Sequence, residues 1–329
     1  MIKTKTFYIG LGVLFAGISV VSGLFVFANT PDESPDMSSL GIVHHLPIEG
    51  MLETQIRPQE SKTLELSPVI TFQKNSEILP EPTISAESAI IIDFATGDIL
   101  YQKNPLDRHQ LASITKLLTA IVVLEEYQWN SDRYISMTQT AFDTYGGNSL
   151  QVGEQFKVED IIRASLMMSS NDAAQLLAEQ FGGVDVFIKK MNQKATDLNM
   201  EGSEFFNSHG LDQKPQSNYS TAADIVKLTQ YIYDKHPELM EVLRQKETTI
   251  TSQSGQAIRI GNTNELLGVS SQMIGAKTGL TNEAGETLSS VVSIKDRIVG
   301  IVVLQSDIGG YRFQDTQNLI KWVEDNYSL

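Results

Sequence analysis

The order in which two kinds of hydrophobic periodicity occur most constrains the fold of this chain. Short apolar segments at 89–93 and 98–101, separated by Phe-Ala-Thr-Gly, predict a β-hairpin. From residue 113 to residue 233 apolar residues recur at helical spacing, and after Lys246 short strand-like segments return. Strands on both sides of a helical block predict an α+β fold. In such a fold an antiparallel sheet is built from both ends of the domain, is flanked by helices, and carries an inserted helical subdomain.

The first helix of the block is apolar almost all round, which predicts that it is buried in the centre of the domain. Its apolar residues are Ile114, Leu117, Leu118, Ile121, Val122 and Leu124. Periodicity and end signals predict further helices at 158–167, 172–181, 184–198, 220–233 and 313–323, and strands at 247–252, 256–260, 272–277, 287–294 and 298–304. The last helix would cover the sheet, and a site is expected between the sheet and the helices.

The first 28 residues predict export. Lys3 and Lys5 precede an uncharged run at 7–28. As a helix rising 1.5 Å per residue, this run is long enough to span a hydrocarbon core of about 30 Å. Residues 1–28 are therefore predicted to be an N-terminal membrane anchor or a cleavable signal peptide, in which Val26-Phe27-Ala28 would precede the cut. In both cases the rest of the chain is expected at the extracytoplasmic face of the membrane or secreted.

Composition narrows the function further. Residues 29–86 are rich in Pro, Ser and Glu without a sustained period, which predicts a flexible extracytoplasmic linker before a folded domain at 87–329. The formal net charge of −15 argues against nucleic acid as a partner, because no Lys and Arg cluster is present to neutralise phosphates. The chain has no cysteine, which excludes disulfides and thiolate metal sites.

Three short patterns, each present once, carry the candidate chemistry: Ser113-Ile-Thr-Lys116, Ser169-Ser-Asn171 and Lys277-Thr-Gly279. Residues three apart share one face of a helix, so the Ser113 hydroxyl and the Lys116 amine can lie within hydrogen-bonding distance. A serine becomes a good nucleophile when a base takes its proton. A lysine is such a base only if burial, a second cation or the helix dipole lowers its pKa. Alternatively, Ser113 caps the helix and Lys116 extends to solvent.

The second pattern adds a proton path. Ser169 can pass a proton to a leaving amine, and the Asn171 amide can hold both a substrate carbonyl and the Lys116 amine. Alternatively, both residues serve as the turn and cap of the helix that follows, since serine and asparagine are common at helix starts.

The third pattern adds a group that binds substrate. Lys277, at the end of a predicted strand, would supply positive potential to an anionic substrate, and Thr278 could hydrogen-bond its carboxylate. Gly279 permits close approach of backbone to substrate, and the N–H groups of Leu280 and Ser113 could form an oxyanion hole. Alternatively, the pattern is an exposed strand end with a turn glycine.

Together and in this order, the three patterns resemble the active site of penicillin-recognising serine enzymes. Flanking stretches narrow the resemblance to the D-alanyl-D-alanine carboxypeptidases, which are low-molecular-mass penicillin-binding proteins. The resemblance extends from about Ser88 to Val323. The flanking stretches are 89–101, Gly153-Glu154, 170–174, 206–212, 220–224, 262–267 and Ala284-Gly285.

The resemblance implies a β-lactamase/transpeptidase-like fold and an acyl-enzyme mechanism on peptidoglycan stem peptides that end in D-Ala-D-Ala. Water would release the shortened peptide, β-lactams would act as covalent inhibitors, and no metal or cofactor would be needed. His209 would be structural. Carried over to this chain, the catalytic residues are Ser113 as nucleophile, Lys116 as its base, Ser169 and Asn171, and the substrate-binding residues are Lys277, Thr278, Gly279 and Leu280.

Two departures from the family bear on these expectations. Leu280 stands where a His, Tyr or another ring is frequent, which affects the expected substrate preference or deacylation rate. Many members also carry a further β-domain and a C-terminal amphipathic anchor. Since this chain ends about 50 residues after Lys277, membrane attachment would fall to its N-terminal segment.

Several related activities stay open at this point. A class A β-lactamase shares two of the patterns, but the Glu-x-x-Leu-Asn of those enzymes is not found in this sequence. A DD-endopeptidase or a transpeptidase would use the same acyl-enzyme. A non-catalytic penicillin or wall-binding sensor would keep the fold without turnover.

Overall fold

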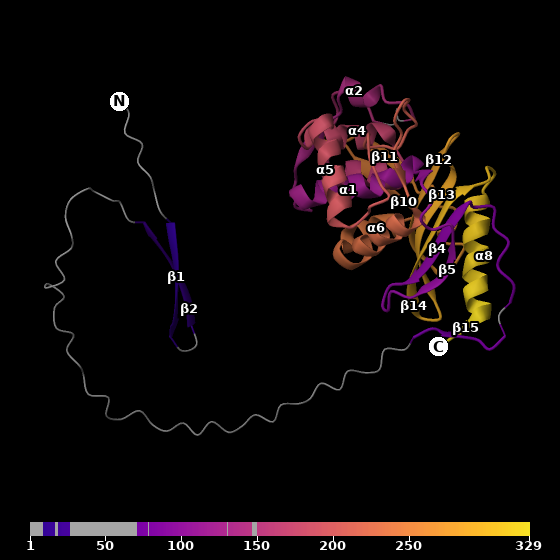
Figure 1. The fold of residues 1–329 in the computed structure, drawn as a ribbon. Coiled ribbons are helices and arrows are strands. Elements are labelled where there is room, and N and C mark those ends of the chain that lie inside the picture. Colours follow the sequence, from indigo (N-terminus) through magenta and orange to yellow (C-terminus); the bar gives the residue numbers. More distant parts are fainter. Residues whose placement is uncertain (1–8, 17–18, 27–70, 78, 130, 147–149) are drawn as a thin grey trace, which may run out of the picture. The chain divides into compact units, whose positions relative to one another are not determined.

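The computed structural model describes residues 9–16, 19–26, 71–77, 79–129, 131–146 and 150–329 of the chain. The chain divides into two units, Met1–Leu66 and Ser67–Leu329, which are described separately (Figure 1). All side chains discussed below belong to the second unit.

In the first unit, β1 (Ile9–Ala16) and β2 (Ser19–Val26) pair as antiparallel strands. The single helix predicted over 7–28 is therefore not found at these residues. Valine and phenylalanine occur in both segments and favour strands, and the glycines at 10, 12 and 23 disfavour a helix. Within the described ranges, no helix has the length and apolarity needed to cross a membrane.

A five-stranded antiparallel sheet forms the centre of the second unit, which confirms the predicted α+β fold. The N-terminal hairpin lies beside the last of the C-terminal strands, in the order β12-β13-β14-β4-β5 (Figure 1). β12 is therefore an edge strand. The strands are β4 (Ser88–Asp93), β5 (Ile99–Lys103), β12 (Met273–Thr281), β13 (Gly285–Ile294) and β14 (Arg297–Ser306).

Both faces of this sheet are buried, so neighbouring residues on one strand enter different cores. Ile91 and Val303 pack in the core beneath the C-terminal helix, whereas Ile90 and Val302 pack with the helical block. This explains why the central strands read as nearly continuous apolar runs instead of alternating ones.

The C-terminal helix α8 (Tyr311–Asn326) covers one face of the sheet, as expected from the sequence (Figure 1). Beside it, β15 (Tyr327–Ser328) pairs with β3 (Gln73–Lys74). The Asp315 carboxylate accepts hydrogen bonds from the backbone of residues 85 and 86, and the Trp322 indole donates to the Pro80 carbonyl. The described part of the folded domain therefore begins at residue 71, ahead of the boundary predicted at residue 87.

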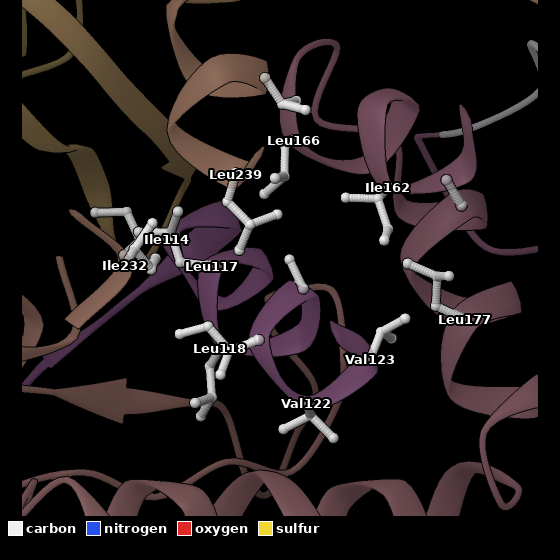
Figure 2. Close-up of a cluster of buried hydrophobic side chains, with 14 of the residues drawn as sticks. Ile114, Leu117, Leu118, Val122, Val123, Ile162, Leu166, Leu177, Ile232 and Leu239 are labelled. Atoms are coloured by element: carbon white, nitrogen blue, oxygen red, sulfur yellow. The ribbon is translucent and has the colours of Figure 1, made fainter. Parts of the chain in front are cut away.

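The helical block covers the other face and is built around α1 (Thr115–Glu126). Leu118 and Val123 of α1 are fully buried, and Figure 2 shows them among side chains from the surrounding helices, as the all-round apolar sequence predicts. The surrounding helices are α2 (Gln139–Phe142), α3 (Val158–Leu166), α4 (Asn171–Gln180), α5 (Val184–Asp197), α6 (Ala222–Lys235) and α7 (Pro237–Arg244).

Sequence periodicity did not indicate two helices, α2 and α7, or three of the four small strand pairs in the described part of the second unit. Pro237 at the first helical position is a typical start signal for α7, but the helix is short. β10 (Glu247–Thr251) and β11 (Ala257–Gly261) were predicted as strands, and they form a ribbon of their own instead of joining the main sheet. The remaining pairs join β6 (His109–Gln110) to β9 (Tyr219–Ser220) and β7 (Tyr134–Ser136) to β8 (Gln155–Lys157).

Candidate active site

Ser113 lies in a 3₁₀ turn, Ala112–Ile114, that leads directly into α1. It does not cap the helix, because no side chain accepts a hydrogen bond at either helix start. Ala112 has a φ of 47°, in the left-handed region that costs a residue with a Cβ on the order of 1 kcal/mol. The backbone before the hydroxyl is therefore held in a strained form by its surroundings.

Two glycines allow those surroundings to approach the turn closely. A Cβ on Gly210 would lie 1.8 Å from the Ala112 carbonyl oxygen. A Cβ on Gly279, in β12, would lie 2.3 Å from the Thr287 hydroxyl and 2.9 Å from the Leu111 carbonyl oxygen. Only glycine fits at these contacts, which bring the loop at Gly210 and the edge strand β12 against the turn that carries Ser113.

Lys116, in the first turn of α1, points its amine back at the serine. Its Nζ lies 2.7 Å from Ser113 Oγ, 2.6 Å from Asn171 Oδ1 and 2.6 Å from the His209 carbonyl oxygen. The residue is fully buried, whereas Ser113 keeps part of its surface exposed. The alternative in which Lys116 extends to solvent is therefore wrong.

The surroundings of Lys116 favour its neutral form. Burial, which removes water from the ammonium, holds the pKa of Lys116 well below its ordinary value, and the positive charge of Lys277 lowers it further. The carboxylate of Asp172 acts in the opposite direction but does not reverse the shift. A neutral amine 2.7 Å from a hydroxyl oxygen can accept its proton.

The second pattern lies between α3 and α4, on the other side of Lys116. The Asn171 side chain bridges two segments, because its Oδ1 accepts from Lys116 and its Nδ2 donates to the Tyr145 carbonyl at 2.7 Å. The cap of α4 is Ser170, whose hydroxyl accepts from the backbone N–H of Ala173. Ser169 is thus free of the capping role, and its φ of 61° is a second left-handed backbone in the site.

The third pattern lies within β12 instead of at its end, because the strand continues to Thr281. Lys277 is 1% exposed, and its Nζ donates to Ser169 Oγ at 3.0 Å. The Thr278 hydroxyl lies 2.5 Å from the Thr263 hydroxyl. The third pattern is therefore joined to the second by a direct hydrogen bond.

Arg312, at the start of α8, is a member of the site that no short pattern indicated. Its guanidinium donates to the Gly279 carbonyl at 3.2 Å and lies 3.6 Å from the Glu286 carboxylate. Burial and then the charge of Arg312 lower the pKa of Lys277 to about 7. Thr263 lies in the stretch 262–267 that supports the family resemblance, but no role in the site was predicted for it. Its contact with Thr278, like that of Arg312 with Gly279, is made through packing and not through a spacing in the sequence.

His209 contacts the amine through its backbone and not its ring. Burial, followed by the charge of Lys116, lowers the pKa of His209 to about 3, so the ring is neutral. Its Nδ1 accepts the Leu211 N–H at 3.2 Å. The ring therefore helps to fold the loop whose carbonyl holds Lys116.

The structure thus brings the predicted side chains into two linked pairs, Ser113 with Lys116 and Ser169 with Lys277. Leu280 lies on the exposed side of β12, with 49% of its surface accessible. In the described ranges, no group of three or more His, Asp or Glu side chains could hold a metal ion. The arrangement suits activation of a hydroxyl beside a binding region for an anion.

The family model for D-alanyl-D-alanine carboxypeptidases matches residues 75–307. A D-alanyl-D-alanine endopeptidase of Pseudomonas aeruginosa is 33% identical over 246 residues, which cover 73% of this chain and 78% of that protein. The D-alanyl-D-alanine carboxypeptidase DacD of Salmonella typhimurium is 29% identical over 278 residues, which cover 80% of this chain and 69% of that protein.

One solved structure is similar to this chain over nearly all of that structure's own length. Penicillin-binding protein D2 from Listeria monocytogenes, in its cefotaxime-bound form, superimposes with a TM-score of 0.66 at 31% identity. The superposition covers 74% of this chain and 99% of that one.

Proposed function

This chain belongs to the D-alanyl-D-alanine carboxypeptidase family and is a serine-type peptidase, and we propose that it removes the terminal D-alanine of peptidoglycan stem pentapeptides through an acyl-enzyme on Ser113. The observation that carries this proposal is the buried amine of Lys116, 2.7 Å from the Ser113 hydroxyl. That contact supplies a base in the neutral form that nucleophilic catalysis by serine requires.

In the first step, Lys116 Nζ takes the Ser113 proton while Oγ attacks the carbonyl carbon of the penultimate D-alanine. The C–N bond to the terminal D-alanine then breaks, and its nitrogen receives the proton held by Lys116, by way of Ser169, which leaves the lysine amine neutral again. A water molecule attacks the resulting ester while one of its protons passes to Lys116. As the ester bond breaks, Lys116 returns this proton to Ser113 Oγ, and the shortened peptide leaves with a new carboxylate.

Substrate binding is assigned to the β12 edge. Lys277 and Thr278 would hold the terminal carboxylate, with the charge of Arg312 close by. The backbone N–H groups of Ser113 and Leu280 would stabilise the oxyanion that develops in the transition state. Asn171 would hold the peptide carbonyl as well as Lys116.

The direct test is release of D-alanine by the purified full chain from a synthetic pentapeptide ending in D-Ala-D-Ala. We expect one D-alanine per peptide, and no release by Ser113→Ala. Binding of the pentapeptide without D-alanine release would identify a non-catalytic sensor and contradict the proposal.

β-Lactams are expected to acylate the same serine, by similarity to the cefotaxime-bound structure of the Listeria protein. Mass spectrometry of the intact chain after incubation with penicillin should show one adduct, located on the peptide that contains Ser113. Slow release is expected, and rapid multiple turnover would instead indicate a β-lactamase.

Endopeptidase activity is a second candidate, because a relative with that name is 33% identical to this chain. The same acyl-enzyme would form, but the leaving amine would belong to a neighbouring stem peptide instead of to free D-alanine. Cross-linked dimeric wall fragments, incubated with the enzyme and separated by chromatography, would yield monomers if this activity is present.

The N-terminal segment is proposed to direct the catalytic domain to the outer side of the bacterial membrane. The support is Lys3 and Lys5 ahead of the uncharged run at 7–28. A protease added to whole cells should cleave the catalytic domain once the layers outside the cytoplasmic membrane have been made permeable, while that membrane is still intact. Recovery in the cytosol would contradict the proposal.

A further inference from the structure

The carboxylate of Glu286, which has no part in the proposed catalytic steps, is buried at the start of β13. In the sheet Glu286 lies opposite Leu280 of β12, the residue that follows Gly279. A buried carboxylate is costly unless hydrogen bonds and charges compensate it. The groups that contact this carboxylate come from the start of α8.

Three backbone N–H groups donate to the Glu286 side chain. Those of Gly309 and Gly310 lie 3.1 and 2.9 Å from Oε1, and that of Arg312 lies 3.1 Å from Oε2. The Arg312 guanidinium adds a positive charge 3.6 Å from Oε1. Burial acts to raise the pKa of Glu286, but the N–H groups and the charge of Arg312 outweigh it and lower the pKa below its ordinary value. Glu286 is therefore charged.

Glu286 thereby caps α8 from a different part of the chain. Helices α2, α4 and α6 are each capped by the serine or threonine that precedes them. By contrast, α8 follows Gly310, which has no side chain to accept a hydrogen bond, and its first turn has no acidic residue. That turn carries Arg312, a cation at the positive end of the helix dipole. The carboxylate from β13 supplies both the acceptors and the negative charge that the helix start lacks.

The same contacts fix the position of the Arg312 side chain. Its Nη1 donates to the Gly279 carbonyl at 3.2 Å, and its Nε is buried without a hydrogen-bond partner among the described residues. The guanidinium also lies over the ring of Phe313, but that ring belongs to the same helix and would move with it. Glu286 and Gly279 thus tie the guanidinium to the sheet, and Glu286 also holds the backbone that carries it.

We propose that Glu286 is a positioning residue for substrate binding: it caps α8, pairs with Arg312, and so holds the guanidinium at the β12 edge beside the place assigned to the terminal carboxylate of the substrate. The inference rests on the proposed peptidase function, since it uses the same carboxylate position. Without the Glu286 carboxylate, the start of α8 loses its acceptors and the guanidinium moves away from the edge strand. The attraction for the substrate carboxylate is then weaker.

The test measures kcat and KM of the full chain for D-alanine release from a synthetic pentapeptide that ends in D-Ala-D-Ala. Glu286→Gln keeps the size of the side chain but removes its charge and one acceptor oxygen. We expect KM to rise about threefold and kcat to stay within about twofold, because Ser113 and Lys116 are not touched. Glu247→Gln, at an exposed glutamate of β10 that also pairs with an arginine, is the matched control and should keep the wild-type values. An unchanged KM in Glu286→Gln would overturn the inference.

A double-variant cycle tests whether Glu286 acts through Arg312. In the Arg312→Gln enzyme, the further change Glu286→Gln should leave KM unchanged, because the charge that Glu286 positions is already absent. An equal rise of KM in both backgrounds would show that Glu286 acts independently of Arg312, and it would contradict the proposal.

The pH dependence separates positioning from a simple loss of charge. Burial, followed by the charge of Arg312, lowers the pKa of Lys277 to about 7, and kcat/KM is expected to decline above this pH as Lys277 loses its proton. If the guanidinium moves away in Glu286→Gln, the decline should shift to higher pH. If the guanidinium stays, only a negative charge is lost, and a decline that is unmoved or shifted to lower pH would count against positioning. Lys116 and Glu265, the other charged groups that act on this pair, are unchanged in the variant.

The outcomes separate this inference from the proposed function. If the wild-type chain releases no D-alanine, the proposed function fails, and the inference is tested by the penicillin concentration that half-saturates acylation, since penicillin also carries a carboxylate. If the wild type is active and Glu286→Gln changes neither KM nor the decline, only the inference fails. Thermal unfolding followed by circular dichroism reports whether each variant is folded. If Glu286→Gln is not, Glu286→Asp, which keeps the charge on a shorter side chain, should raise KM in the same way, and an unchanged KM there would also overturn the inference.

Discussion

Two buried lysines, one in the helical block and one in the sheet, have similar surroundings but are suited to different tasks. Lys116 lies in the first turn of α1 and Lys277 in β12, and they are 0% and 1% exposed. Burial is the largest cause of the lowered pKa at both. What distinguishes them is the hydrogen-bond partner: Lys116 contacts the Ser113 hydroxyl, and Lys277 contacts that of Ser169.

The two lysines are also coupled. The charge of Lys277 lowers the pKa of Lys116, and burial, followed by the charge of Arg312, lowers the pKa of Lys277 itself to about 7. A substrate carboxylate bound at Lys277 would favour its protonated form. That proton would in turn keep the Lys116 amine neutral, so that binding of the anion prepares the base. Burial thus favours the neutral form of both amines. The charges around each lysine, which include Arg312 and a bound substrate carboxylate beside Lys277, then decide which of the two amines accepts a proton.

The largest effect is expected when arginine replaces Lys116. Arginine stays protonated in proteins and cannot take the serine proton. Lys116→Arg should therefore lower the rate of penicillin acylation on the order of 10³-fold or more. Stopped-flow measurement with a fluorescent penicillin gives the rate, and Lys116→Met, which lacks the charge, serves as a second variant in case arginine disturbs folding. Retention of a tenth of the wild-type rate in either variant would mean that another group is the base.

Replacement of Lys277 by arginine should reduce activity much less than replacement of Lys116, because a fixed positive charge at this position still binds the carboxylate. Lys277→Arg is expected to lower kcat/KM for D-alanine release about tenfold, through altered geometry.

The pH dependence of kcat/KM distinguishes the two side chains more sharply than the size of the loss. As pH rises through about 7, the free enzyme loses the Lys277 proton and with it the carboxylate partner, so the wild-type kcat/KM should fall on this alkaline side. In the arginine variant this decline should vanish. A decline at the same pH in both would show that Lys277 is not the titrating group.

A smaller effect is expected at Arg312, whose charge acts through Lys277. Removal of the guanidinium in Arg312→Gln takes away a cause of the lowered pKa of Lys277, so the alkaline decline should move to higher pH. KM should rise about fivefold, since roughly 1 kcal/mol of attraction for the carboxylate is lost. Arg312→Lys, which keeps the charge, is the matched control and should leave the decline near its wild-type position. A structural role alone would change kcat without moving the pH of the decline.

The sequence predicted the Ser113–Lys116 pair from its local spacing, whereas the placement of all three patterns in one site was implied by the resemblance to the family. Ser113 and Lys116 share a helix face through three-residue spacing alone, and the periodicity of residues 113–124 requires a buried helix. Arg312 could not be predicted in this way. It lies 35 positions after Lys277 and enters the site because α8 begins beside β12, which is a consequence of sheet order.

Residues 71–86 mark a second limit of sequence reasoning. They show no helical or strand period, which is typical of a linker, yet single long-range contacts fix them on the domain. The Asp315 carboxylate binds the backbone of residues 85 and 86 from 229 or more positions away, and Trp322 binds Pro80. Such contacts satisfy individual backbone groups and leave no periodic signal. The left-handed backbone at Ala112 is similar, because the contact with Gly210 that encloses it is made through folding.

The smallest effect is expected at Leu280, the residue that departs from the family pattern. Its side chain is 49% exposed, and its proposed contribution is a backbone N–H that every residue except proline retains. Leu280→Ala should therefore change penicillin acylation by less than about threefold, in line with other exposed substitutions. Leu280→His restores the ring frequent in the family, and any gain should appear in deacylation, where a ring can orient water. A change in acylation beyond tenfold for alanine would mean that the side chain itself contacts the substrate, which would extend the binding region from the buried lysines to the exposed rim of β12.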